Sequence, residues 1–435
     1  MRRIVQFGMA MLLFVYSCFY DRNIMLVYAE DTLQTDDGIY YEVTEQNTIR
    51  ITGAKASLSE IQIPSEIDGI AVTQIGDYAF LDHTRLQAIV LPDSLQEIGN
   101  YAFLNCSRLE TVKIPVTLQN VGWGILSDTP WLTAQEGEYV IIGNQILIAY
   151  KGTSENISVP KGVRKIAGFA FEKNMMIQSV QLPESLIALN AYAFAGCRKI
   201  QEIQLPMGLQ FIGPNAFFEC KQLQQITIPD SVTEIGERAF YQCSALQTVR
   251  LPNKLKEISA GLFYHCVSLR KIQFPDSVEQ IATVAFQGCT ALGSIILSEH
   301  VYKIEQDAFA DCDNLQQIVL KNANCMLFQT ETTLPEQTII VSEDNSSVKA
   351  YADSYERAFV ALPVLYGDVD GDANVMVEDA VLILTVYARG CVGLQNQLSD
   401  RQKIAADYDQ NGSIQVEDAV AVLTVYARRS AGLEI

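Results

Sequence analysis

A repeat with a fixed length, the spacing from Pro206 to Pro229, runs through most of the chain and restricts the folds that the chain can adopt. Prolines recur at this twenty-three-residue period, and phenylalanines keep step with them. The prolines are Pro92, Pro115, Pro160, Pro183, Pro206, Pro229, Pro252 and Pro275, and the phenylalanines are Phe80, Phe103, Phe171, Phe194, Phe217, Phe240, Phe263, Phe286 and Phe309. A unit this short buries its apolar face only against its neighbours, so the spacing predicts one elongated stack of coils.

Each unit combines a strand pattern with a set of interior positions. In residues 228–251, Leu246, Val249 and Leu251 have the spacing of a strand with one buried face. The other apolar residues would fill the coil, and they are Ile235, Ala239, Phe240 and Cys243. We therefore expect a leucine-rich repeat solenoid in which each coil joins a β-strand to an irregular or short helical segment.

The spacing breaks once, between Trp123 and Pro160. Two apolar runs, residues 139–142 and 146–148, flank Gly143 and Asn144, and this pattern predicts a β-hairpin within an insert at about 128–160. The aromatic residues Trp123, Trp131 and Tyr139 lie in or near the insert. They either pack at the irregular coil or form a patch for a sugar or a protein.

Residues 1–29 have the features of a secretory signal peptide. A basic start precedes an apolar run over residues 4–20, and Ala29 is a small residue just before Glu30 and Asp31. We expect cleavage after Ala29 and export of the protein. Two alternatives are lipidation of Cys18 and a retained membrane anchor.

The net charge of −20 excludes classes of partner. It argues against nucleic acids and anionic membranes, because both attract cationic proteins. The excess is marked in residues 363–435, which hold eleven carboxylates against five Lys or Arg side chains. A divalent cation is the natural counter-ion for such a segment.

The cysteines follow the repeat and do not have the spacing of a disulfide framework. Seven of the ten occupy one slot of the coil, namely Cys106, Cys197, Cys220, Cys243, Cys266, Cys289 and Cys312. One slot in a stack means one column of small buried side chains, a role that free Cys fills well. His83 occupies the slot that Cys106 fills one coil later. Oxidation of adjacent members is the alternative.

An active site is not evident in the sequence. The three histidines stand at unrelated repeat positions, so they form neither a triad nor a zinc site. A signal peptide, a solenoid, a cap and a C-terminal module together use the whole chain, which leaves no separate catalytic domain. We expect no enzyme activity, with an unrecognised hydrolase or protease inhibitor on the solenoid as the alternative.

An acidic twelve-residue loop occurs twice near the C-terminus, beginning at Asp368 and again at Asp407. Carboxylate or amide oxygens stand at loop positions 1, 3, 5 and 12, where a calcium loop places its ligands. These residues are Asp368, Asp370, Asp372 and Asp379 in loop one, and Asp407, Asp409, Asn411 and Asp418 in loop two. Position 7, which offers a backbone carbonyl, is Asn374 or Ser413. The pattern predicts two bound Ca²⁺ ions.

Each acidic loop is followed by the same helical pattern, over residues 380–389 and 419–428. Pro363 and Gly367 argue against a helix that enters loop one. We therefore expect each copy to be a loop followed by a helix, and not a helix-loop-helix.

Two stretches resemble known families. The repeats, at 60–338, are similar to the BspA-type leucine-rich repeats of bacterial surface and secreted proteins, with a lead-in at 30–59 and a closing cap and linker at 339–362. Residues 363–435 resemble a type I-like dockerin, a small all-α calcium-binding module that docks into cohesin modules. The departures are Met376 at position 9 and Ala373 at position 6 of loop one, which imply weaker calcium binding there or a water ligand. Loop two keeps Gly412 and has Gln415 at position 9.

The dockerin resemblance also implies which residues contact the cohesin. They lie at loop positions 10 and 11 and on the following helices, and they are Val377, Glu378, Thr385, Arg389, Val416, Glu417, Thr424, Arg428 and Arg429. Val377-Glu378 matches Val416-Glu417, which implies that the module binds in two orientations related by a half turn. The alternative is a calcium-bound terminus that binds no partner.

Together these features predict a secreted, non-catalytic component of a cellulosome-like complex that degrades plant polysaccharide. The dockerin would bind a scaffold cohesin, and the solenoid would offer a protein- or glycan-binding surface. Its outward strand positions are mostly polar, for example Glu202, Gln204, Thr248 and Arg250. A free or surface-attached adhesin is the alternative.

Overall fold

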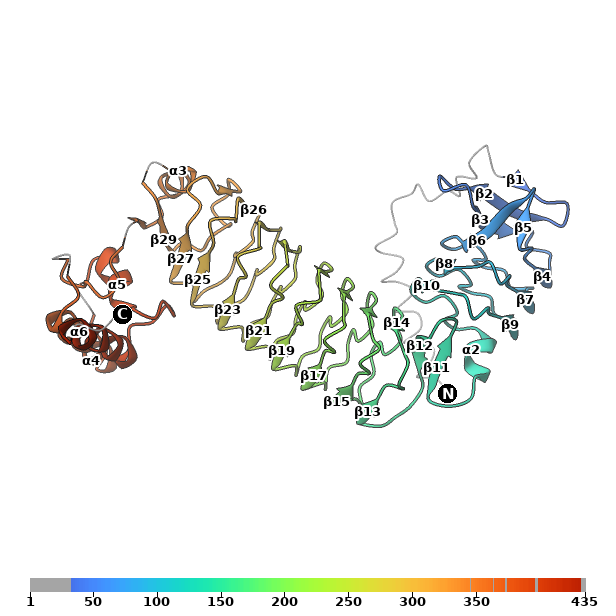
Figure 1. The fold of residues 1–435 in the computed structure, drawn as a ribbon, viewed down its shortest axis with the longest axis horizontal. Helices are drawn as coiled ribbons and strands as arrows, with labels where there is room; N and C mark the ends of the chain where they lie inside the picture. The colour runs from blue at the N-terminus through green and yellow to red at the C-terminus, as the bar shows by residue number, and fades with distance from the viewer. Residues whose placement is uncertain (1–32, 345, 363, 372–373, 396–397, 432–435) are drawn as a thin grey trace. The chain divides into compact units, whose positions relative to one another are not determined.

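The structure is a computed structural model (Figure 1), and it describes residues 33–344, 346–362, 364–371, 374–395 and 398–431. The predictions for the signal peptide, Cys18, Asp372 and Ala373 lie outside these residues. The chain divides into two compact units, one with Met1–Thr117 and Ile125–Thr133, the other with Leu118–Gly124 and Ala134–Ile435.

The first unit begins with antiparallel strands and continues into parallel coils. Strands β1 (Leu33–Gln34), β2 (Ile39–Val43) and β3 (Ile49–Ala54) pair antiparallel, after which β6 (Ile70–Ile75) and β8 (Glu97–Ile98) add in parallel. The strand β5 (Glu66–Ile67) pairs antiparallel with β6. A second parallel ladder holds β4 (Glu60–Gln62), β7 (Ala88–Val90) and β9 (Thr111–Lys113). Helix α2 spans Pro130–Ala134.

The second unit contains a stack of coils with strands on two sides (Figure 1). The outer strands, which we call the long ladder, are β13 (Asn156–Ser158), β15 (Ser179–Gln181), β17 (Glu202–Gln204), β19 (Gln225–Thr227), β21 (Thr248–Arg250), β23 (Lys271–Gln273), β25 (Ser294–Leu297), β27 (Gln317–Leu320), β29 (Ile339–Ser342) and β30 (Phe359–Ala361). The short strands are β10 (Asn120–Val121), β12 (Ile146–Tyr150), β14 (Lys165–Ile166), β16 (Ala188–Leu189), β18 (Phe211–Ile212), β20 (Glu234–Ile235), β22 (Glu257–Ile258), β24 (Gln280–Ile281), β26 (Lys303–Ile304) and β28 (Met326–Leu327). Register is set by the repeat, since Val249 lies opposite Ile272, its equivalent in the next unit. The predicted solenoid is confirmed.

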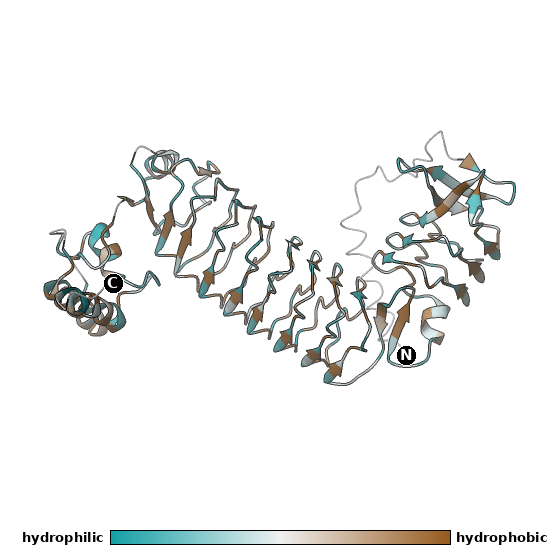
Figure 2. Ribbon diagram, viewed as in Figure 1, coloured by the Kyte–Doolittle hydropathy of each residue, from teal (hydrophilic) through white to brown (hydrophobic). Residues whose placement is uncertain are grey.

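One continuous hydrophobic core runs through these coils, from Leu147 to Ala352. Figure 2 shows that hydrophobic segments recur from coil to coil along the stack. Its centre is the column of repeated phenylalanines, whose rings stack face to face between neighbouring coils. The ring centroids of Phe217 and Phe240 are 5.3 Å apart, and those of Phe240 and Phe263 are 5.7 Å apart. Each coil therefore depends on the next for its core.

The cysteine column is confirmed as a set of free, buried thiols. The Cys243 Sγ donates a hydrogen bond to the Phe217 carbonyl of the preceding coil at 3.2 Å, and the same bond recurs at each of the seven repeat cysteines. Burial raises the pKa of Cys243 to about 12, so the thiol keeps its proton and acts as the donor. His83 substitutes for it as predicted, with Nε2 2.9 Å from the Ala54 carbonyl.

The predicted hairpin is present, and its second strand is part of the solenoid. Strand β11 (Tyr139–Ile142) pairs antiparallel with β12, and β12 then pairs in parallel with β14. The Trp123 ring stacks on Phe169 at a centroid distance of 6.0 Å, and Tyr139 packs on Tyr150 at 5.0 Å. These contacts cover ring faces, which favours packing over a sugar-binding patch.

The last coil is closed by helix α3 (Ser347–Ser354) together with β30. The helix begins at Ser346, whose Oγ accepts a hydrogen bond from the Lys349 amide at 3.0 Å. Val348 and Tyr351 are buried in the solenoid core. The Tyr351 hydroxyl donates to the Thr330 carbonyl at 2.9 Å. The end of the core is thereby shielded from solvent.

The described residues from 364 to 431 form what we call the helical module. It contains α4 (Val377–Cys391), α5 (Asp400–Ala406) and α6 (Val416–Ser430), and α4 packs against α6 over a small core of its own. The helix predicted after each acidic loop is present.

The prediction of a loop and helix alone is wrong for the second copy, because α5 leads into loop two. Ser399 begins this helix in a capping box with Gln402, a signal that the sequence pattern contains. None of the described helices is both long and apolar enough to cross a membrane.

Candidate metal sites and exposed helix faces

Loop two brings three carboxylates together at the junction of α5 and α6. Asp407 follows the last residue of α5, Asp418 lies in the first turn of α6, and Asp409 lies between them in the loop. One oxygen from each lies within 4.8 Å of the others. These three predicted ligands are therefore neighbours in space.

Backbone amides orient the carboxylates of loop two. Asp407 accepts hydrogen bonds from the amides of Asn411 at 3.0 Å and Gly412 at 2.8 Å. Asp418 accepts from the amides of Gln415 at 2.8 Å and Asp409 at 3.2 Å. Gly412 has a φ of 86°, the left-handed conformation that the tight turn needs.

Loop one repeats the arrangement with Asp368, Asp370 and Asp379, which also offer oxygens within 4.8 Å of one another. Asp379 accepts from the amides of Val369 at 2.7 Å and Met376 at 2.8 Å, so it matches Asp418 in loop two. Met376 is partly exposed and brings no oxygen from its side chain. The remaining predicted ligands, Asn374, Asn411 and Ser413, lie in the same loops.

The negative charge of the carboxylate cluster in loop two is not balanced by an ion pair with a basic side chain in the described part of the chain. Asp418 is fully buried and Asp407 is 4% exposed, and among the described residues no Lys or Arg forms an ion pair with either. Burial, with a smaller contribution from the charge of Asp418, raises the pKa of Asp407 to about 7. Burial also raises the pKa of Asp418. A set of three neighbouring carboxylates, two of them buried, fits a hard divalent ion such as Ca²⁺. Two bound calcium ions remain a prediction.

Without calcium, the helical module is expected to lose stability as the pH rises from about 4 to about 7. The folded-state pKa of Asp407 lies above its ordinary value of 3.8, so the folded state binds the proton more tightly than the unfolded state does. That stabilisation is complete at low pH and is lost as pH rises through the folded pKa. Thermal unfolding in chelator at several pH values measures it. Stability that increases over this range would contradict the assignment.

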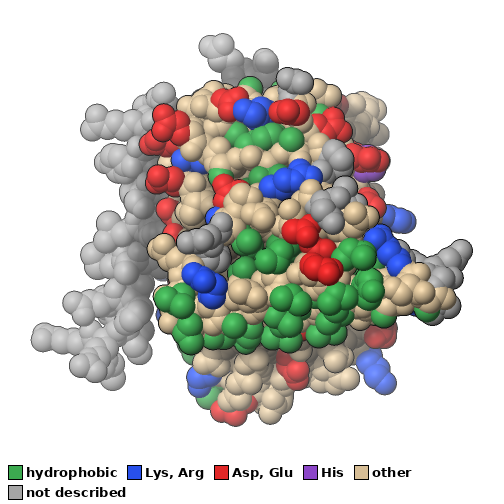
Figure 3. Space-filling model, turned by 90° about the vertical axis from the view of Figure 1, so that its left-hand side faces the viewer, with side chains coloured by type: hydrophobic (Ala, Val, Ile, Leu, Met, Phe, Trp, Pro, Cys, Tyr) green, Lys and Arg blue, Asp and Glu red, His purple; other side chains and the backbone are tan. Residues whose placement is uncertain are grey.

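All nine predicted partner-contact residues are exposed on the helical module. The structure adds two apolar pairs that sequence reasoning missed, Val381 with Leu384 on α4 and Val420 with Leu423 on α6. The two pairs occupy equivalent places in the two copies, the signal that could have identified them. They continue the exposed faces that start at Val377 and Val416. Figure 3 shows hydrophobic side chains gathered in a band on this end of the molecule.

Parallel ladders stacked one repeat apart, with a column of buried phenylalanines, define a leucine-rich repeat solenoid. The family model for the BspA type leucine-rich repeat region matches residues 53–136, 141–228 and 210–332, in six copies. These matches cover more than half of the chain, which therefore belongs to the BspA-type leucine-rich repeat family. The match does not extend into the helical module.

Several solved structures are similar to the chain. A leucine-rich repeat protein from Bacteroides ovatus is 25% identical, with a TM-score of 0.36 over 76% of this chain and 99% of that one. A leucine-rich cell surface protein from Faecalibacterium prausnitzii is 25% identical, with a TM-score of 0.29 over 65% and 93%. The T. pallidum leucine-rich repeat protein is 24% identical, with a TM-score of 0.24 over 60% and 91%. No curated protein matches the chain.

Proposed function

We propose that the protein is an exported, non-catalytic binding protein that attaches to a scaffold through its helical module. In this proposal the helical module is a type I-like dockerin that binds a cohesin when its two loops hold calcium. The observation that carries the proposal is the paired geometry of the module, since a cluster of three carboxylates, two of them buried, lies beside an exposed apolar helix face in each of the two copies.

The physical logic connects the metal to the partner face. Asp379 and Asp418 lie in the first turns of α4 and α6, so a cation held by each loop would fix the helix start where Val377 and Val416 are exposed. Calcium, when bound, would supply the positive charge that the buried carboxylates lack. The chain's own amides already orient those carboxylates, so the site requires little rearrangement on binding.

The solenoid is proposed to bind a protein or an extended glycan. In the middle coils, the long-ladder residues on either side of a buried centre are exposed, as in β17, β19 and β21. These positions are polar and of mixed charge, which suits a hydrogen-bonding surface. With the scaffold attachment, this supports a role in a cellulosome-like complex that acts on plant polysaccharide.

The deciding experiment is a calorimetric titration of the chain from residue 30 onward against a panel of cohesin modules, in calcium and in chelator. Tight binding to one or a few cohesins in calcium only is the expected result. Absence of binding to every cohesin would overturn the dockerin assignment and favour a free or surface-attached adhesin with a structural calcium module.

Two alternative faces make a specific mutational prediction. Changing Val377 and Glu378 together to alanine is expected to leave cohesin affinity within about twofold, because the matching pair Val416 and Glu417 still offers a complete face. Changing both pairs should weaken binding at least about tenfold, a loss of roughly 1.4 kcal/mol or more.

Titration of the three variants against the same cohesin measures this difference. The reciprocal variant, with Val416 and Glu417 changed alone, is the matched control and should behave like the first. Loss of binding in either single-pair variant would refute the two-orientation model.

A further inference from the structure

The outward side chains of the long ladder change character in the last coils. The position that holds Gln204, Thr227, Arg250 and Gln273 in the middle coils becomes apolar at the end of the stack. The apolar residues are Ile296, Val319, Val341 and Val360, and we call them the terminal patch; the register places them side by side on β25, β27, β29 and β30. An apolar surface in place of a polar one indicates a covered face.

The helical module covers the terminal patch. Ile404 of α5 is 1% exposed and belongs to the same hydrophobic cluster as Val319, Val341 and Val360. It does not belong to the core between α4 and α6. Leu362, Val364 and Tyr366, from the segment that links the solenoid to the module, pack against the same cluster. The side chain of Ile404 therefore packs against the solenoid and not in the core of its own module.

A second contact involves loop two. The residue that precedes each long-ladder strand is Gln or Arg in the middle coils, as in Gln224, Gln247 and Arg270, but it is Gly293 before β25. Gly412 of loop two lies directly against Gly293. A Cβ added to Gly412 would lie only 2.7 Å from the Gly293 carbonyl oxygen, so the two backbones are in close contact. An added Cβ on Gly293 would lie 3.4 Å from the Asn411 carbonyl oxygen, so a full Gln side chain would run into the loop.

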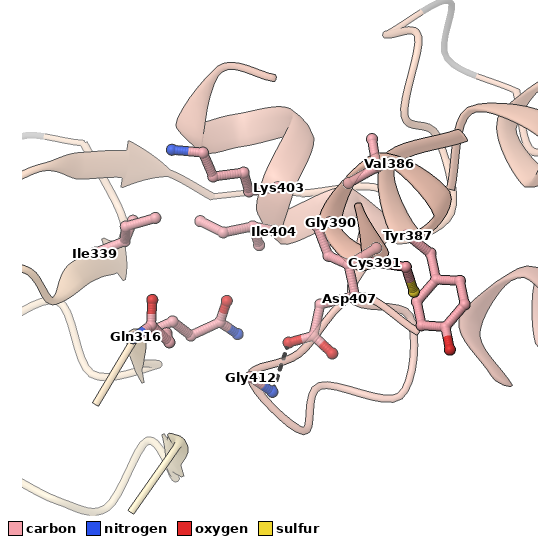
Figure 4. A pocket seen from close by; sticks show the side chains of 12 residues that line it. Gln316, Ile339, Val386, Tyr387, Gly390, Cys391, Lys403, Ile404, Asp407 and Gly412 are labelled. Atoms are coloured by element: carbon pink, nitrogen blue, oxygen red, sulfur yellow. Dashed lines mark hydrogen bonds between the residues drawn. The ribbon is translucent and has the colours of Figure 1, made fainter. Parts of the chain in front are cut away.

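Between the two contacts lies a hollow of about 460 Å³ (Figure 4). Gln316 and Ile339 line it from the solenoid, and Tyr387 and Cys391 line it from the end of α4. The contact is thus made at two places, with Ile404 on one side and Gly412 on the other. Two separated contacts restrict rotation as well as distance.

We propose that the terminal patch is a docking face for the chain's own helical module, with loop two seated against Gly293. The module is then held as one body with the last coils and does not move on a free tether. Val381 and Val420 are exposed in this arrangement, so both helix faces stay accessible and a bound partner takes a fixed orientation relative to the solenoid. This docking holds whether or not the partner is a cohesin.

Limited chymotrypsin digestion of the chain from residue 30 onward, in calcium, tests the docking. Cleavage after Leu365 or Tyr366 would release the module, and its rate is followed by mass spectrometry. Ile404→Asp is expected to accelerate this cleavage at least tenfold, because a charge cannot replace the buried isoleucine. The matched control is Val420→Asp, the same change at an exposed helix position, and it should leave the rate within twofold of the wild type.

A second variant changes the solenoid side of the contact and leaves the sequence of the helical module unchanged. Gly293→Gln restores the residue found in other coils and is expected to accelerate cleavage several-fold. Its control is Arg270→Gln, the same product one coil earlier, with no change expected. Cleavage at the wild-type rate in Ile404→Asp would show that the module does not dock on the terminal patch. Cleavage at the wild-type rate in Gly293→Gln would show that loop two does not pack against Gly293.

The two proposals fail in different ways. Ile404→Asp should keep full cohesin affinity in calorimetry, since both partner faces are intact. Val381→Asp combined with Val420→Asp changes both faces, so it should weaken that affinity without altering cleavage. Absence of cohesin binding in the wild type would end the dockerin proposal and leave the cleavage results as they stand.

Discussion

Calcium binding at loop two is expected to disappear when Asp407 and Asp418 are both replaced by alanine. These residues supply the first and last carboxylates of the loop and are held by backbone amides on opposite sides of the cluster. A calcium loop of this kind draws on about six to eight oxygens, and the double change removes both of its buried carboxylates. Isothermal calorimetry should fall from two bound ions per chain to one.

The control for this experiment is Glu417→Ala, which removes an exposed carboxylate directly beside Asp418. It changes the net charge in the same direction but leaves the cluster in place, so two ions should still bind. If the double variant also binds two ions with wild-type affinity, the ligand assignment is wrong. If the wild type binds none, the buried carboxylates have another role.

Replacing Phe240 by alanine is expected to lower the free energy of unfolding of the solenoid by about 3–5 kcal/mol. The ring is fully buried and stacks on Phe217 and Phe263, so the change leaves a cavity between three coils. Because each coil contacts only its neighbours, the loss falls on two adjacent interfaces and weakens the coupling between the halves of the stack.

Urea unfolding followed by circular dichroism measures the effect. Lys254→Ala is the matched control, since it truncates a long exposed side chain in the next turn of the same solenoid and should change stability by less than about 0.5 kcal/mol. A loss below about 1 kcal/mol for Phe240→Ala would mean that the column does not hold the coils together.

Much of the fold could be predicted because its interactions repeat in the sequence. The spacing of Pro229, Phe240 and Cys243 from their equivalents is the spacing of the strands in register. The hairpin at Gly143 was predictable because its turn signal is local. The acidic loops were predictable for the same reason, since Asp407, Asp409 and Asp418 lie close in sequence as well as in space.

The features that the sequence did not predict depend on which segment packs against a residue in the folded chain. Helix α5 is a single short helix with a weak apolar pattern, and its one buried isoleucine faces the solenoid and not the module core. Val420 and Leu423 have the spacing of buried helix positions, yet they are exposed because no part of the described chain covers them. The periodicity of a helix shows which of its faces is apolar, but it does not show which other segment, if any, packs against that face.

The repeating and local patterns of the sequence are enough to predict a stack of coils with one column of phenylalanines and one of thiols, and two acidic loops that precede two equivalent helices. The backbone at positions such as Val284 and Arg238, with φ angles of 52° and 56°, follows from tertiary contacts and not from the local sequence. Side chains of this kind disfavour that conformation in isolation.

The stack imposes it, because the Arg238 amide donates to the Ala260 carbonyl of the next coil at 3.0 Å and the Val284 amide donates to the Gln306 carbonyl at 3.0 Å. The tertiary structure also decided which apolar residues are covered, and it placed Ile404 on the terminal patch. Both outcomes have one physical reason: they depend on contacts between segments that a local pattern does not encode.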